Sequence, residues 1–173
     1  MVDRSRLYGI HGQSRKGLLE LAEKYGIKDP PAASAGCALT SPDFSKKVRD
    51  VFRHHPDYER WQFELLKIGR HFRLDRQTKV VISRNHTQNQ YLETLHPPGT
   101  SLLTCHNFGG PHALLIGNPT EGNLQKAGQL MLRYAQKGGP EILEILWRRE
   151  EKENIFTLDA IIQEPVLEKM RIV

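Results

Sequence analysis

The 173-residue sequence has few of the residues on which several protein classes depend. It contains two cysteines, Cys37 and Cys105. Two are too few for a disulfide framework and lack the paired spacing of a zinc site, so a reducing, cytoplasmic setting is expected. No apolar run approaches the roughly 20 residues that a membrane-spanning helix needs. The N-terminal residues also lack the apolar core of a signal peptide. The sequence therefore predicts a soluble intracellular protein without membrane contact.

Common catalytic motifs are missing too. There is no nucleophile elbow, zinc-protease motif, P-loop or Rossmann fingerprint. Cys105, His106 and His112 fall within a predicted hairpin, but no fourth ligand accompanies them, so no metal is expected. Cys37 follows a run of small residues, where an inert thiol is commoner than a reactive one, and it stays the one catalytic candidate. We expect no cofactor and, for this chain alone, no catalysis.

The sequence does have an excess of basic residues, unevenly placed. The formal net charge is +5 and the pI is near 9.3. Residues 43–84 contain 11 Lys and Arg against six Asp and Glu, whereas residues 141–173 contain five against eight. A basic face built mainly from 43–84 would suit a polyanionic partner such as nucleic acid.

Hydrophobic periodicity predicts helices first and strands later. The expected helices are residues 15–25, a segment starting at Ser41–Pro42, residues 58–68, the segment after a polar cluster at 84–89, and residues 121–137, which Gly138–Pro140 would stop. The expected strands are residues 71–74 and 79–83, 101–106 and 112–117, 141–147 and a short one at 155–156. A charged turn is expected at 148–154, and the last 20 or so residues are ambiguous. This order favours an α+β fold with N-terminal helices, a mixed, mainly antiparallel sheet and a packed helix.

The most informative stretch is residues 77–95. An apolar strand, Val80–Ile82, runs into the polar cluster Arg84–Asn89 and then into an amphipathic helix. Arg suits phosphate or a stacked base, and Asn and Gln can pair with base edges or the ribose hydroxyl. The same Asn residues could instead cap the helix and hold the turn. From the residues alone, ligand binding and helix capping are equally supported interpretations of this cluster.

Residues 83–92, SRNHTQNQYL, resemble the G-R-N-x-x-Q-N-x-x-L signature of the RNA-binding domain of NFACT proteins. The segments L-T-C-H at 103–106 and G-P-H at 110–112 resemble that family's W-x-H and P-G-S-H segments. Earlier segments, including P-A-A-S-A-G-C at 31–37 and L-L-K-I-G-R-H-F-R-L at 65–74, are similar to the tail of PP-loop proteins of the tRNA 2-thiouridylase-like type. The nucleotide-binding loop of PP-loop enzymes is absent from the sequence.

The resemblance implies a non-catalytic RNA-binding domain at residues 41–173, preceded by a helical preface and a Pro/Ala-rich connector at 1–40. Its expected partners are RNA, specifically tRNA, and a PP-loop ATP-pyrophosphatase domain in the same or another chain of a thiouridylase-like transferase. The expected RNA contacts are the corner residues Arg84, Asn85, Gln88 and Asn89, the adjoining Arg70, His71, Arg73, His106 and His112, and the peripheral Lys46, Lys47 and Arg49. Two alternatives stay open: sulfur transfer through Cys37 in tRNA thiolation, and a protein-docking module.

Overall fold

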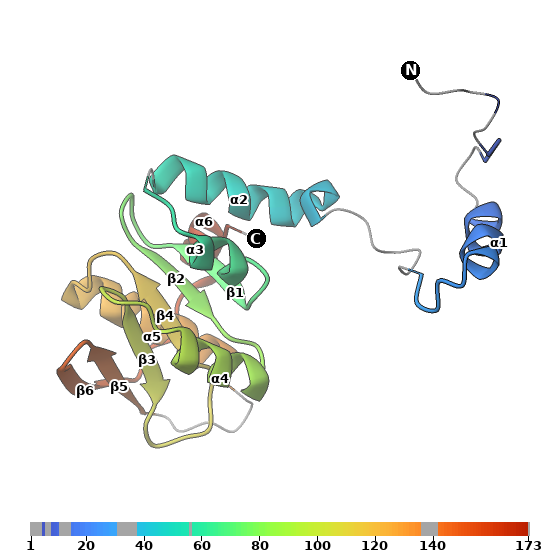
Figure 1. The fold of residues 1–173 in the computed structure, drawn as a ribbon. Coiled ribbons are helices and arrows are strands. Elements are labelled where there is room, and N and C mark those ends of the chain that lie inside the picture. Colours follow the sequence, from blue (N-terminus) through green and yellow to red (C-terminus); the bar gives the residue numbers. More distant parts are fainter. Residues whose placement is uncertain are drawn as a thin grey trace. The chain divides into compact units, whose positions relative to one another are not determined.

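The structure is a computed structural model that describes residues 5, 8–10, 15–30, 38–55, 57–135 and 142–172. The chain divides into two compact units, Met1–Thr40 and Ser41–Val173, and each is considered by itself. Figure 1 shows the chain coloured along the sequence, and strands β1 to β6 belong to the second unit.

The described residues of the first unit include the α-helix α1 (Lys16–Lys24) and a short 3-10 helix, η2 (Ala38–Thr40). Helix α1 ends as its sequence predicts, since Gly26 adopts a positive φ of 67° and the N–H of Ile27 donates to the carbonyl of Ala22. That arrangement satisfies carbonyls that would otherwise lack a partner at the end of a helix. Cys37 lies outside the described residues, so the expectations attached to it remain expectations.

The second unit is built on a six-stranded sheet. Its strands are β1 (Arg70–Arg73), β2 (Lys79–Ile82), β3 (Ser101–Cys105), β4 (Ala113–Ile116), β5 (Leu143–Arg149) and β6 (Lys152–Leu158). Their order in the sheet is β1-β2-β4-β3-β5-β6, and every neighbouring pair is antiparallel. The predicted α+β class and the two strand pairs are confirmed.

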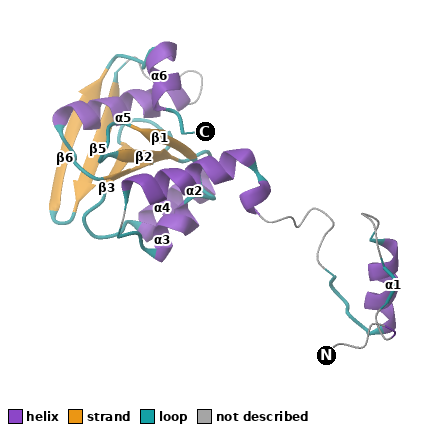
Figure 2. Cartoon of the chain, turned by 90° about the horizontal axis from the view of Figure 1, so that it is seen from above, coloured by secondary structure: helices purple, strands orange, loops and turns teal. Residues whose placement is uncertain are grey.

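Helices cover both faces of this sheet, as Figure 2 shows. One face carries α5 (Glu121–Tyr134) and α6 (Glu164–Met170). The other carries α2 (Pro42–His54), α3 (Arg60–Leu65) and α4 (His86–Leu95). The central strands read as nearly unbroken apolar runs because both of their faces are covered.

Each face has its own hydrophobic core. Under α5 and α6, the alternate residues Val80 and Ile82 of β2 pack with Leu130, Met131 and other apolar side chains. On the opposite face, Val81 of β2 packs with Leu92 of α4 and its neighbours. Successive residues of one strand therefore stabilise two different helix layers.

Three details depart from the expectations. Helix α5 ends at Tyr134, earlier than predicted, and Gly138–Pro140 lies outside the described residues. The segment 148–154 was expected as a turn, but strands β5 and β6 run through it and leave only Glu150 and Glu151 at the turn. Its charged side chains fit a strand because β6 is an edge strand whose residues are largely exposed. The ambiguous C-terminal segment contains α6.

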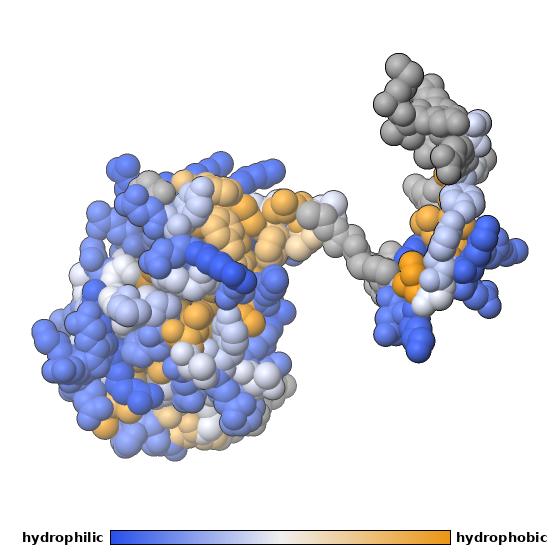
Figure 3. Space-filling model, viewed as in Figure 1, coloured by the Kyte–Doolittle hydropathy of each residue, from blue (hydrophilic) through white to orange (hydrophobic). Residues whose placement is uncertain are grey.

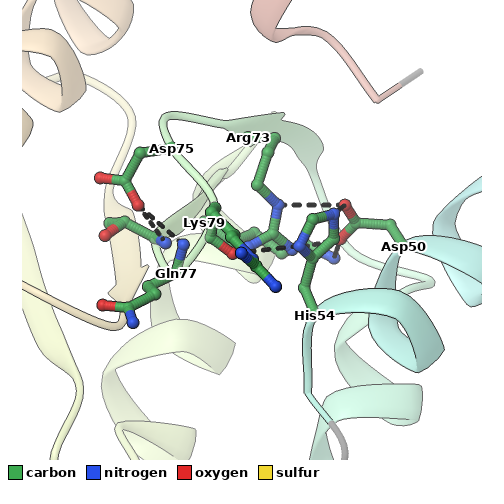
Figure 4. A network of polar contacts seen from close by, with 8 residues as sticks. Asp50, His54, Arg73, Asp75, Gln77 and Lys79 are labelled. Carbon is green, nitrogen blue, oxygen red and sulfur yellow. Dashed lines mark hydrogen bonds and ion pairs between the residues drawn. The ribbon is translucent and has the colours of Figure 1, made fainter.

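Helix α2 is fastened to the β1–β2 hairpin by a polar network (Figure 4). The Asp50 carboxylate accepts hydrogen bonds from Arg73 Nε at 3.0 Å, Arg73 Nη2 at 2.6 Å and Lys79 Nζ at 3.1 Å. Burial opposes ionisation of Asp50, yet these cations lower its pKa overall. In the turn of the hairpin, Asp75 Oδ1 accepts from the backbone N–H groups of Gln77 and Thr78, both at 2.8 Å. The contacts of Asp50 with Arg73 and Lys79 fix the position of α2 against the hairpin, and those of Asp75 fix the hairpin turn.

Viewed as in Figure 1, the surface shows hydrophobic residues over the region of α2 and mostly hydrophilic residues over the strands β5 and β6 (Figure 3). The exposed apolar part of α2 includes Phe52, whose ring contacts those of Tyr58 and Phe63 at centroid distances of 5.0 and 5.7 Å. Tyr58 is also half exposed. None of the helices in the described part of the chain is long and apolar enough to cross a membrane.

Candidate nucleic-acid interface

The polar corner lies where β2 ends and α4 begins. Asn85 is the N-cap of α4, and its Oδ1 accepts from the backbone N–H of Gln88 at 3.0 Å. In return, Gln88 Oε1 accepts from the backbone N–H of Arg84 at 2.9 Å. The capping interpretation therefore holds for Asn85, and the side chain of Gln88 is used within the corner itself. Both contacts leave the side chain of Arg84 exposed to solvent.

A second set of hydrogen bonds joins the corner to the loop between β3 and β4. The Asn89 side chain donates to the carbonyl of Gly110 at 3.1 Å, and its Oδ1 accepts from the Ser83 hydroxyl and from the backbone N–H of His112 at 3.2 Å. The His112 N–H also donates to Ser83 Oγ at 2.9 Å. Two segments far apart in sequence are thereby held together, and Asn89 serves to build the site.

Between these segments lies a pocket of about 500 Å³. Its walls come from the corner, the first turns of α4, the β3–β4 loop and the end of α5. The lining residues are Ser83, Arg84, Asn85, His86, Asn89, Gln90, Glu93, Cys105, Phe108, Gly109, Gly110, Pro111, His112 and Tyr134. The volume lies within the range usual for ligand pockets.

Arg84 of the corner lines this pocket, and two further cations interact with Arg84 in a cation cluster: Lys47 of α2 and Arg70 of β1. Burial and then the Arg84 charge lower the pKa of Lys47, and the same two causes, in the same order, lower the pKa of Arg70. Among the described residues, none of the three forms an ion pair with a carboxylate. The Asp43 charge partly offsets these effects by raising the pKa of Lys47. Neighbouring cations that have no carboxylate within ion-pair distance attract anions such as phosphate.

Arg70 is also held by an aromatic ring. Its guanidinium carbon lies 4.3 Å from the ring centroid of Tyr134, a favourable cation–π contact. The Tyr134 ring lies 6.0 Å from that of Phe72, and its hydroxyl accepts from Arg171 at 3.2 Å. Sequence reasoning did not name Tyr134 or Phe108 as site residues. Tyr134 shares one face of the predicted helix 121–137 with apolar residues, and the loop containing Phe108 has no periodicity.

Other predicted site residues lie elsewhere. His71 has no exposed surface, and its Nε2 is hydrogen-bonded to the carbonyl of Ile68 at 2.8 Å. Arg73 is 14% exposed and is paired with Asp50. His106 is exposed but does not line the pocket. The structure thus does not bring these three side chains to the pocket. Because successive side chains of a strand point to opposite faces of the sheet, His71 and Arg73 of β1 point away from the face to which Arg70 points.

The predicted peripheral residues lie on α2 with different surroundings. Lys46 is exposed and 3.8 Å from Asp43, and Arg49 is exposed. Lys47 is half-buried, with its Nζ donating to the carbonyl of Leu66 at 3.2 Å. Only Lys47 of the three belongs to the cation cluster.

Two titratable groups inside the pocket are kept uncharged at neutral pH. Burial raises the pKa of Cys105 to about 11, and its thiol donates to the carbonyl of Pro111 at 3.5 Å. Burial likewise lowers the pKa of His112, although its Nδ1 is 3.4 Å from Glu93. No group of three or more metal-ligating side chains is found in the residues the structure describes. A protonated thiol is a poor nucleophile, so the pocket is suited to binding.

An antiparallel α+β domain with a rigid polar pocket bordered by unpaired cations has the features of a nucleic-acid-binding module. The sequence profile of the NFACT protein RNA binding domain matches residues 69–170. The chain belongs to this family of RNA-binding domains, as its resemblance predicts. The match contains every residue that lines the pocket.

Comparison with solved structures finds a similar chain in Streptococcus suis, described as the C-terminal part of the fibronectin/fibrinogen-binding protein. The two are 14% identical with a TM-score of 0.49, and the alignment covers 76% of this chain. It covers 61% of the other chain, so this protein spans less than two thirds of that structure. No curated protein matches significantly.

Proposed function

We propose that this domain binds tRNA through the pocket and the cation cluster Lys47–Arg70–Arg84. The observation that carries the proposal is the pocket inside the family match, which Arg84 lines, together with Lys47 and Arg70, which interact with Arg84. Among the described residues, none of these cations has a carboxylate within ion-pair distance. Phosphates would supply the missing negative charge, and the amides of the corner would contact ribose or base edges. RNA is the partner class of the family, and tRNA is the finer proposal.

We further propose that the bound tRNA is delivered to a PP-loop ATP-pyrophosphatase domain that carries out thiolation. This step is supported by the segments at 31–37 and 65–74 that resemble the tails of such proteins. The chemistry would then lie outside the pocket, in keeping with the protonated state of Cys105.

Binding of an unmodified tRNA transcript, followed by fluorescence anisotropy at several salt concentrations, tests the proposal. Arg84→Ala removes one exposed guanidinium without disturbing the backbone contact between Arg84 N–H and Gln88. It should weaken binding and reduce the slope of log affinity against log salt by about 0.7 to 0.9, the change for one lost phosphate contact.

Arg76→Ala is the matched control. Arg76 is equally exposed but lies in the turn at the other end of the β1–β2 hairpin. It should leave both the affinity and the salt slope close to those of the unmodified protein. Equal behaviour of the two variants would refute the assignment of the corner. A folded protein that ignores tRNA but captures a protein partner would instead support the docking alternative.

A further inference from the structure

The pocket differs from a surface that only follows a phosphate backbone. Phosphate contacts need cations and backbone N–H groups, which can be presented on a flat or convex surface. Here the cations border a hollow that also contains an aromatic ring, Phe108, and the side-chain amides of Asn85 and Gln90. Among the described residues, neither the Nδ2 of Asn85 nor the amide of Gln90 takes part in a hydrogen bond. These groups remain available to a ligand that enters the hollow.

The aromatic residues have different roles. Tyr134 has Arg70 over its ring and Phe72 nearby, so it forms a fixed wall. Phe108 is half-buried in the β3–β4 loop, where it packs against the hydrophobic core and also lines the pocket. Its ring provides a flat surface of the kind on which an unstacked base packs.

The walls are also set in advance. The hydrogen bonds that Ser83 and Asn89 make with Gly110 and His112 hold the β3–β4 loop against α4. Preformed walls reduce the entropy lost when a ligand binds. A pocket of about 500 Å³ is large enough for one nucleotide but not for a stretch of duplex.

We propose that this pocket takes one unpaired RNA nucleotide, with its base beside Phe108 and its phosphate on Arg84 and Arg70. The inference rests on the proposed RNA-binding function and deepens it. A base within an A-form helix is stacked on both faces and cannot enter such a hollow. Extruding it would consume binding energy, so single-stranded ends or loops are the preferred ligands.

The test compares a short single-stranded RNA with the blunt duplex of the same sequence. The single strand should bind about tenfold or more tightly at equal salt, since a base stacked on an aromatic side chain contributes a factor of this size. A 4-thiouridine placed in the single strand should photocrosslink to a peptide containing Phe108. Equal affinity for both RNAs, or crosslinks only outside the pocket, would overturn the inference.

Gly109 offers a substitution at the pocket lining. A Cβ built there meets no protein atom within 4 Å, and the same is true at Gly122 in the first turn of α5, outside the pocket. Gly109→Leu should weaken single-strand binding severalfold more than Gly122→Leu and leave duplex binding unchanged. Equal effects of the two variants on single-strand binding would count against a base in the pocket.

Two tRNA substrates distinguish the source of the nucleotide. One keeps its single-stranded 3′ end and the other has that end removed. If only the intact molecule loses affinity on Gly109→Leu, the terminal nucleotides occupy the pocket; if both lose affinity, a loop nucleotide does. A domain that binds tRNA in an Arg84-dependent manner without preferring single strands would keep the proposed function and refute this inference. Failure to bind any RNA would refute the proposed function itself.

Discussion

Replacing Asp50 with Asn should destabilise the domain more than any other single loss of charge on α2. The Asp50 side chain is 10% exposed and accepts hydrogen bonds from Arg73 and Lys79, which are 14% and 2% exposed. The Asp50→Asn change keeps the shape of the side chain and removes its charge. Two cations with little access to water then remain without a counter-ion between α2 and the sheet.

Removing one partner of a buried ion pair costs roughly 3–5 kcal/mol, because the other charge is left desolvated. We expect the lower end, about 3 kcal/mol, since Lys79 can release its proton. Burial already lowers the pKa of Lys79 to about 8, and the Asp50 charge is the largest influence that raises it. Without Asp50 the lysine would lose its proton near neutral pH and so limit the penalty.

Urea unfolding followed by circular dichroism measures this loss as a lower midpoint at an unchanged m-value. Asp43→Asn is the matched control, because Asp43 lies on the same helix but is 65% exposed and only 3.8 Å from Lys46. An exposed pair of this kind contributes about 0–1 kcal/mol. If the two variants lose the same stability within about 0.5 kcal/mol, the Asp50 network does not hold α2 in place.

Two further predictions concern titratable groups. Because the pKa of Lys79 falls from 10.5 in the unfolded chain to about 8 in the folded one, the unfolded state binds more protons between these values. The free energy of unfolding should therefore rise with pH from about 8 to 10.5, and Lys79→Met should remove this rise. Urea unfolding of both proteins at several pH values measures it. The same dependence of the unfolding free energy on pH in both proteins would refute the prediction. Since the pKa of Cys105 is about 11, its alkylation by iodoacetamide at pH 7.5 should be far slower than that of a free thiol. Modification of Cys105 at the free-thiol rate, mapped by mass spectrometry, would contradict its burial.

Local chemistry explains which elements the sequence predicts well. The β1–β2 hairpin turns at Asp75, whose carboxylate accepts two backbone N–H groups within three residues. Helix α2 starts at Ser41, whose hydroxyl accepts from the N–H of Phe44, and α4 starts at Asn85. Each of these interactions lies within one turn of the chain, so its residues can be read from the sequence alone.

Interactions between distant segments explain what the sequence could not predict. Lys79 and Arg73 contribute to the basic count of residues 43–84, but Asp50, more than 20 residues away, neutralises both inside the protein. His71 is buried in β1, which pairs with β2, and its ring is hydrogen-bonded to the carbonyl of Ile68. The sequence therefore predicted that residues 43–84 carry an excess of positive charge. It could not predict which of these basic side chains are accessible to a ligand.

The capping and binding interpretations of the polar corner are compatible, because they use different atoms. Asn85 caps α4 through Oδ1, and Asn89 holds the β3–β4 loop with both of its side-chain polar atoms. These contacts fix the backbone that presents Arg84. Among the described residues, they leave Nδ2 of Asn85 free to donate a hydrogen bond to a ligand. Replacing either Asn would disturb the fold as well as any ligand contact, since a lost cap alone costs about 1 kcal/mol. Among the described residues, the Arg84 side chain takes part in none of these capping and loop contacts. Its removal therefore leaves them in place and also relieves its repulsion of Lys47 and Arg70, so that weaker RNA binding would reflect the lost guanidinium contact.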